Sequence, residues 1–90
     1  MTETPTHPTW SWGIGESSDN YYDYWCYHEA NEYEIHMFWD KGQGHTVEVI
    51  PINGFDENDD PIYGYNEESD NFDTEEQALE YVEELMDKYA

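Results

Sequence analysis

The chain has 90 residues, of which 23 are Asp or Glu and 2 are Lys or Arg, and its formal net charge is -21. This length allows one domain. A surface so anionic repels phosphate groups, so we expect a basic protein as partner and no direct contact with nucleic acid or membrane. No apolar run approaches the roughly 18 residues of a membrane span, and the first residues lack signal-peptide features, which predicts a cytoplasmic protein.

Aromatic side chains take the place of an aliphatic core. Leu, Ile, Val and Phe together make up 13 residues, whereas nine Tyr and four Trp bring the aromatic content to 18%. Each ring can bury roughly 150–250 Å², so we expect a folded domain over residues 10–90. Residues 1–9 contain two prolines and no periodicity, which predicts a flexible N-terminal tail.

The first half of the chain has the period of β-strands. Apolar and polar residues alternate over 10–15, and an aromatic run over 21–28 is typical of a strand. The strongest alternation covers 32–39, and we expect it to pair through the glycine-bearing loop 40–44 with a strand over 45–52. A three-residue turn at 29–31 is predicted to join the second and third strands.

The second half begins with an acidic turn over 53–61, followed by a short edge strand at 62–65 and an acidic linker at 66–71. The period then becomes helical over 74–89. Thr74 and Gln77 fit a capping box at its start. The apolar stripe of this helix consists of Ala78, Leu79, Val82, Leu85, Met86 and Tyr89.

These elements predict an α+β fold, in which an antiparallel meander of three to five strands is covered on one face by the C-terminal helix. Val82 and Leu85 are expected to pack on the sheet. The face beneath the helix is predicted to hold Trp25, Tyr27, Tyr33, Ile35, Met37, Val47 and Val49. The opposite face, a possible binding surface, is predicted to hold Tyr24, Cys26, His28, Glu34, His36, Phe38, Thr46, Glu48 and Ile50.

Two sets of side chains could bind a metal ion. Asp56, Asn58, Asp60 and Glu67 have the spacing of calcium-loop positions 1, 3, 5 and 12, although Pro61 replaces the required glycine. The alternative is a solvated acidic loop. Zinc could be held by Cys26, His28 and His36, with Glu34 or Glu48, if these share a sheet face. The alternative there is two surface histidines and a small buried cysteine.

No motif indicates catalysis. The chain has no Arg, no glycine-rich phosphate loop and no nucleophile elbow, and its many carboxylates are expected to face solvent rather than a pocket. Cys26 is the single cysteine, which excludes an intramolecular disulfide. We therefore expect a non-enzymatic protein without a cofactor.

The composition of the whole chain resembles that of small cytosolic proteins from halophilic archaea, although no motif carries the likeness. The chain departs from them in having only three Ala and three Val. In multimolar salt the Debye length falls to about 3 Å or less, so the repulsion among carboxylates is screened. The resemblance implies a high-salt cytoplasm and no particular activity.

The alternative is mimicry of a nucleic acid, as in small acidic inhibitors of restriction or CRISPR proteins. Carboxylates on a rigid scaffold can occupy a groove built for phosphates. The predicted helix would carry an acidic strip suited to this role. The residues of the acidic strip are Glu76, Glu80, Glu83, Glu84 and Asp87.

Overall fold

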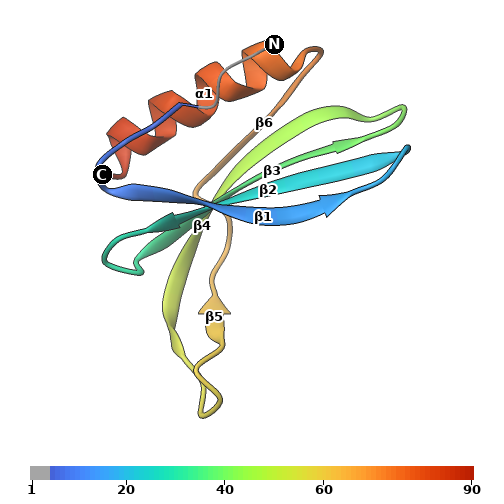
Figure 1. Ribbon diagram of the computed structural model, residues 1–90. Coiled ribbons are helices and arrows are strands. Elements are labelled where there is room, and N and C mark those ends of the chain that lie inside the picture. Colours follow the sequence, from blue (N-terminus) through green and yellow to red (C-terminus); the bar gives the residue numbers. More distant parts are fainter. Residues whose placement is uncertain (1–4) are drawn as a thin grey trace.

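A computed structural model describes residues 5–90, apart from the side chain of Ile14. These residues form an antiparallel sheet and one C-terminal helix, which agrees with the predicted α+β class (Figure 1). The sheet has six strands, one more than the largest number predicted. The elements are β1 (Trp10–Ser17), β2 (Tyr21–His28), β3 (Tyr33–Asp40), β4 (Gly44–Phe55), β5 (Pro61–Tyr63), β6 (Glu68–Phe72) and α1 (Glu75–Lys88).

The strands do not form a simple meander, because the long strand β4 pairs with two later strands. Strands β1 to β4 are neighbours in chain order. The first half of β4 then pairs with β6, with His45 opposite Phe72, and its second half pairs with β5, with Ile52 opposite Tyr63. The register shifts between Ile52 and Gly54, and such bulges bend a strand. The β4–β5 hairpin accordingly leaves the sheet on the side opposite α1 (Figure 1).

Strand β6 lies where the sequence predicts an acidic linker, and this prediction is wrong. Its segment contains one apolar residue, Phe72, so it shows no alternation that would indicate a strand. The strand is held by backbone pairing along the edge of β4. The Asn71 side chain adds hydrogen bonds, because its Nδ2 donates to the Gln43 carbonyl and to Thr46 Oγ1, both at 2.9 Å.

Helix α1 packs as its periodicity predicts. Thr74 Oγ1 accepts a hydrogen bond from the Gln77 amide at 3.2 Å, which caps the first turn. Val82 and Leu85 are fully buried. The core beneath the helix consists of Trp10, Cys26, Ile35, Met37, Val47, Val49, Ala78, Leu79, Val82, Leu85 and Met86. Among the described residues, no helix is long and apolar enough to cross a membrane.

The side-chain faces of β2 are the reverse of those predicted. Cys26 pairs with Ile35, so it lies under the helix, whereas Trp25 and Tyr27 lie on the opposite face. The turn before β3 has four residues, 29–32, instead of the predicted three, and Asn31 adopts a left-handed φ of 57° within it. A shift of one residue in register moves every side chain of a strand to the other face.

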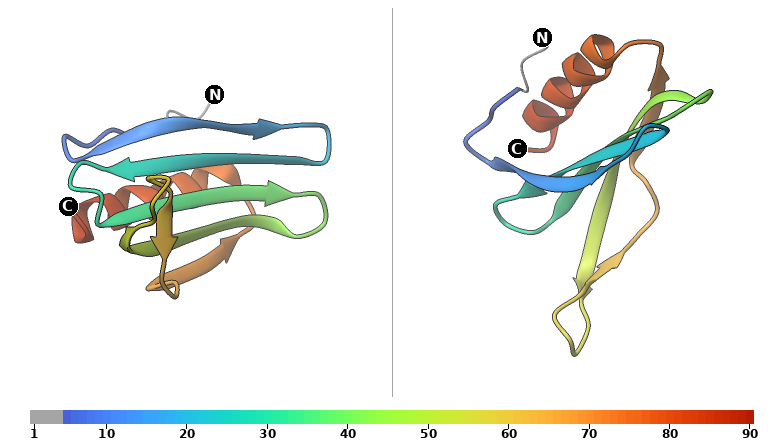
Figure 2. Two further views of the ribbon diagram at one scale, coloured as in Figure 1. Left: turned by 90° about the horizontal axis from the view of Figure 1, so that it is seen from below. Right: turned by 45° about the vertical axis from the view of Figure 1, so that its right-hand side comes forward.

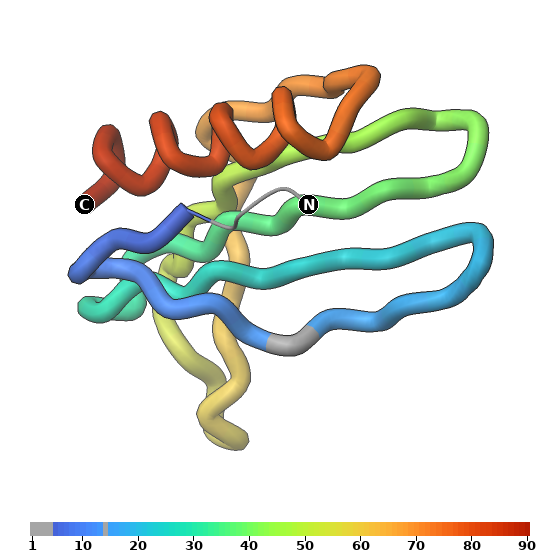
Figure 3. The backbone as a smooth tube through the Cα atoms, turned by 45° about the horizontal axis from the view of Figure 1, so that its top comes forward, coloured from blue at the N-terminus to red at the C-terminus, as the bar shows by residue number. Residues whose placement is uncertain are grey.

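The N-terminal segment that precedes β1 contacts the domain from residue 5 onward. Trp12 Nε1 donates to the Pro5 carbonyl at 2.7 Å, and His7 Nε2 lies 3.2 Å from Asp87 Oδ1 of α1. Figure 3 shows this segment running beside the C-terminal end of the helix. Residues 1–4 of the predicted tail lie outside the described residues.

Candidate functional site

The side of the sheet opposite α1, here called the open face, combines aromatic and charged side chains. Figure 2 (left) looks onto it, and the β4–β5 hairpin is the element that crosses in front. Strand alternation and the pairing register assign residues from three strands to this face. They are Tyr21, Asp23, Trp25, Tyr27, Glu34, His36, Phe38, Thr46, Glu48 and Ile50.

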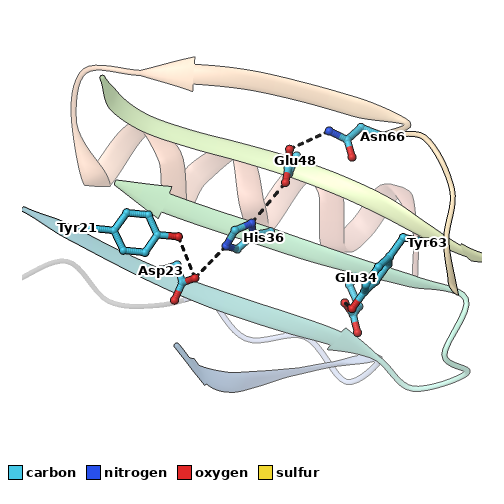
Figure 4. Close-up of polar contacts among 7 residues, drawn as sticks. All are labelled: Tyr21, Asp23, Glu34, His36, Glu48, Tyr63 and Asn66. Carbon is cyan, nitrogen blue, oxygen red and sulfur yellow. Dashed lines mark hydrogen bonds and ion pairs between the residues drawn. The ribbon is translucent and has the colours of Figure 1, made fainter. Parts of the chain in front are cut away.

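A row of hydrogen bonds crosses the open face from β2 to the segment before β6 (Figure 4). Tyr21 Oη donates to Asp23 Oδ2 at 3.0 Å, and the same oxygen lies 3.2 Å from His36 Nε2. On the other side of the ring, His36 Nδ1 lies 3.4 Å from Glu48 Oε1. Asn66 Nδ2 donates to Glu48 Oε2 at 2.8 Å. We call these five residues the polar row.

His36 lies at the centre of the polar row, between the carboxylates of Asp23 and Glu48. Each of its ring nitrogens faces a carboxylate oxygen, and a neutral imidazole has one N–H, so the protonated ring is the form that can donate to both. Trp25 stacks on the imidazole with ring centroids 3.9 Å apart and planes 9° apart. An aromatic face also attracts a cation. The imidazole thus bridges two carboxylates on a face that lacks Lys and Arg.

Asp23 is the most heavily hydrogen-bonded carboxylate of the row. Besides Tyr21 and His36, the Glu16 amide donates to its Oδ1 at 2.6 Å. Burial raises the pKa of Asp23, but the bonds from the Glu16 amide, His36 and Tyr21 outweigh burial, so the pKa lies below its ordinary value. Burial and then the bond to Asp23 raise the pKa of Tyr21 to about 12.

A second cluster lies where the β4–β5 hairpin meets the open face. Glu34 is only 6% exposed, and Tyr63 Oη donates to its Oε2 at 2.5 Å (Figure 4). Tyr27 and Ile50 are opposite Glu34 on the two neighbouring strands. Burial and then the bond to Glu34 raise the pKa of Tyr63. We call Tyr27, Glu34, Ile50 and Tyr63 the Glu34 corner.

Exposed apolar side chains continue from this corner along the hairpin. Phe55 and Ile62 are each about half exposed, and Tyr65 is almost completely exposed. An open groove at the base of the hairpin is lined by Pro51, Asn53, Tyr63, Gly64, Tyr65 and Glu67. Tyr63 belongs to both the groove and the Glu34 corner, so the two surfaces are continuous.

The structure does not bring the predicted zinc ligands together, because Cys26 and His28 lie on the helix side of β2 and His36 lies on the open face. The prediction that the three share a face is therefore wrong, because the side-chain faces of β2 are reversed. Cys26 is fully buried, and burial raises the pKa of its thiol. His28 is also buried, and its Nδ1 accepts from the Ala30 amide at 3.1 Å.

Of the predicted calcium residues, Asp56, Asn58 and Asp60 share the tip of the hairpin, and Glu67 is separated from them. At the tip of the hairpin, Asp56 Oδ1 accepts from the amides of Asn58 and Asp60 at 2.8 and 3.0 Å, so this carboxylate stabilises the turn. Glu67 lies at the other end of the hairpin, where its amide donates to the Val49 carbonyl. Within residues 5–90, no three His, Cys, Asp or Glu side chains are grouped so as to hold a metal ion.

The acidic strip lies on the outer surface of α1, and all five of its carboxylate side chains are exposed. Asp87 also contacts His7, as described above. Among the described residues, one lysine forms an ion pair with a carboxylate, namely Lys88 with Glu68 at 2.7 Å. Among the described residues, no carboxylate of the strip therefore forms an ion pair with a lysine.

The sequence does not predict the Glu34 corner, although it indicates Glu34 as a possible metal ligand. It predicts Tyr27 on the helix side and Tyr63 in a short strand with no assigned role. Aromatic residues occupy both faces of β2, so alternation does not distinguish them. Asp23 is the one charged residue in that strand, and it was the available signal for which face is solvated.

Comparisons with family models, with curated proteins and with solved structures found no match. The open face offers aromatic rings, a buried carboxylate and a histidine whose nitrogens both face carboxylates. This chemistry suits binding of a cationic group.

Proposed function

We propose that the protein is a non-enzymatic acidic binding domain, adapted to a high-salt cytoplasm, that binds a basic protein through its open face. The observation that carries this proposal is the balance of charges, 23 acidic residues against 2 basic ones, with one lysine–carboxylate pair among the described residues. At low ionic strength such a surface repels itself. At multimolar salt, where the Debye length is about 3 Å or less, the repulsion among carboxylates is screened and the surface stays hydrated.

The choice of the open face follows from the same salt dependence. Exposed charges separated by more than a Debye length do not attract a partner in concentrated salt, whereas buried charges and aromatic surfaces still act at contact distance. The acidic strip consists of exposed carboxylates, and the open face consists of partly buried aromatic rings and carboxylates. Recognition in high salt therefore favours the open face.

A binding role agrees better with the polar row than catalysis does. Both nitrogens of His36 face carboxylates, and a stacked Trp25 covers one side of the ring. A general base needs a free nitrogen within reach of a substrate proton. Here the ring instead holds β2, β3 and β4 together across the open face.

The test is to follow unfolding by urea at KCl concentrations between about 0.1 M and about 3 M, where the Debye length falls from about 10 Å to less than 3 Å. The free energy of unfolding should rise continuously over this range. A matched variant with the acidic strip neutralised, E76Q/E80Q/E83Q/E84Q/D87N, should depend less on salt. A wild-type protein that is fully stable in dilute buffer and gains nothing from KCl would contradict the adaptation to high salt.

A second function, mimicry of a nucleic acid, is favoured by one observation. The five exposed carboxylates of the acidic strip lie on a helix anchored by the buried Val82 and Leu85, so their spacing is fixed. A mimic must be folded at about 0.15 M salt and must displace DNA from a basic DNA-binding protein, with an affinity that falls steeply as salt rises. A chain that folds only above about 1 M KCl, where exposed charges are screened, excludes this function.

A further inference from the structure

We propose that the Glu34 corner is the binding site for one cationic side chain of the partner, and that this side chain is an arginine. This inference rests on the proposed function, because it names the place and the group through which a basic protein would be recognised. It depends on the burial of Glu34, on the rings beside it and on the absence of a neighbouring cation among the described residues. The first two of these observations are independent of the net charge.

Glu34 is a buried carboxylate whose bonding is incomplete. It is 6% exposed, and the one side chain that donates to it among the described residues is Tyr63, through a neutral hydroxyl. An ionised carboxylate can accept about four hydrogen bonds, and burying its charge without a cation is costly. The nearest histidine on the same strand face, His36, is already engaged by Asp23 and Glu48. A cation from outside the chain would therefore meet an uncompensated charge.

Two half-exposed tyrosines belong to this corner: Tyr63 donates a hydrogen bond to Glu34, and Tyr27 is its partner in the register of β2. Tyr27 is 42% exposed and Tyr63 is 45% exposed, so both remain accessible to a partner. The Tyr27 ring lies across Gly13 of β1, where any Cβ would overlap it. Gly13 thus allows the ring to lie flat on the sheet. Aromatic faces within about 6 Å of a cation attract it, so the rings and Glu34 would act on the same group.

Arginine fits this corner better than lysine does. Its planar guanidinium can donate two parallel hydrogen bonds to one carboxylate and can stack on a tyrosine ring. It is also more weakly hydrated than an ammonium group, so less is lost when it leaves water. An ion pair formed at a buried carboxylate is screened less by salt than an ion pair at the surface. Recognition of a charged group in a high-salt cytoplasm requires this weaker screening.

The probe is a fluorescein-labelled octapeptide of alternating Arg and Gly, with the matching Lys peptide as comparison. Binding is measured by fluorescence anisotropy at about 2 M KCl, where attraction between exposed charges is screened. The wild-type protein should bind the Arg peptide more tightly than the Lys peptide. E34Q should weaken binding of the Arg peptide by about tenfold or more. The control E83Q, on the acidic strip, should bind like the wild type.

Two further variants keep the test informative if E34Q changes the fold. Y27A removes one ring from the solvent side of the corner, and G13A displaces that ring without touching a charge. Both should weaken binding of the Arg peptide while urea unfolding shows a folded protein. If folded E34Q, Y27A and G13A all bind like the wild type, the Glu34 corner is not the site. Equal binding of the Arg and Lys peptides would overturn the choice of arginine.

The same measurements separate this inference from the proposed function. If the wild-type protein binds neither peptide at any salt concentration at which it is folded, binding of a basic partner through the open face fails. If it binds and only the neutralised acidic strip abolishes binding, the proposal for the Glu34 corner fails and a basic partner remains. If light scattering shows a dimer that Y63S dissociates, a second copy of the chain occupies the open face and the corner is not an arginine site.

Discussion

The two faces of the sheet are stabilised in different ways, although they are built from alternate residues of the same strands. In β3, Ile35 and Met37 point toward α1 and are fully buried among aliphatic side chains. Their neighbours Glu34 and His36 point to the open face and contact a tyrosine hydroxyl and carboxylates. One strand thus contributes hydrophobic burial on one side and hydrogen bonds on the other.

This difference shows how a chain with 13 Leu, Ile, Val and Phe residues can fold. Six of those residues lie in the core beneath the helix together with Trp10, Cys26 and both buried methionines, and Trp10 links that core to the helix through a hydrogen bond from Nε1 to the Met86 carbonyl at 3.0 Å. The open face needs no second aliphatic layer, because the polar row and the stacked rings hold its strands together. It is therefore left available for a partner.

The largest effect is expected on the helix side, where Leu85 is 1% exposed. Leu85→Ala removes buried methyl groups and leaves a cavity, so the free energy of unfolding should fall by roughly 2–4 kcal/mol. Urea unfolding at a fixed, high KCl concentration measures this loss. The salt is kept constant so that charge repulsion does not change.

The control for this variant is Glu83→Ala, two residues earlier on the exposed side of the same helix. It should change the free energy of unfolding by about 0.5 kcal/mol or less. If Leu85→Ala were as stable as the wild type, α1 would not be held by hydrophobic burial. The contrast between the two faces would then be lost.

A smaller loss is expected on the open face from Asp23→Asn, because the amide cannot accept the same set of charge-assisted bonds. We expect the free energy of unfolding to fall by about 1–3 kcal/mol at neutral pH. The pKa of Asp23 is lower in the folded protein than its ordinary value of 3.8, so the stabilisation is present above that pH. It is lost as the pH falls through the folded pKa.

Urea unfolding of the wild type and of Asp23→Asn between neutral and acidic pH tests this expectation. The two free energies should differ at neutral pH and converge in acid. Asp19→Asn, in the exposed turn before β2, is the control and should follow the wild type throughout. If the free energies of unfolding of the wild type and Asp23→Asn still differed in acid, the ionised form of Asp23 would not be what stabilises the fold.

The elements under the helix and the open-face residues of β3 and β4 could be predicted from sequence, whereas the faces of β2 could not. The alternation of Ile35, Met37, Val47 and Val49 and the helix stripe that contains Leu85 each have one apolar side, so their faces follow from hydrophobicity. In β2, aromatic residues occur on both sides, and a one-residue difference in turn length reversed the faces.

Strand β6 and the Glu34 corner escaped prediction for a related reason. The stability of β6 comes from backbone pairing with β4, which leaves little trace in side-chain pattern. The corner depends on a hairpin that bends at a bulge and places Tyr63 over a strand nearly thirty residues earlier in the chain. Local periodicity has no information about such a contact.

The smallest effect, with the opposite sign, is expected on the acidic strip. Glu80 lies four residues after Glu76 and four before Glu84, so two like-charged pairs repel along the helix. Glu80→Lys turns both repulsions into attractions, each worth about 0.2–0.5 kcal/mol, and should stabilise the protein by roughly 1 kcal/mol at low salt. Because these side chains are exposed, the gain should vanish at about 1 M KCl, and Glu80→Gln should give about half of it.

Glu80→Lys should also bind the Arg peptide like the wild type at about 2 M KCl, since the strip acts through screened charges alone. Loss of peptide binding in Glu80→Lys under those conditions would move the site from the open face to the helix.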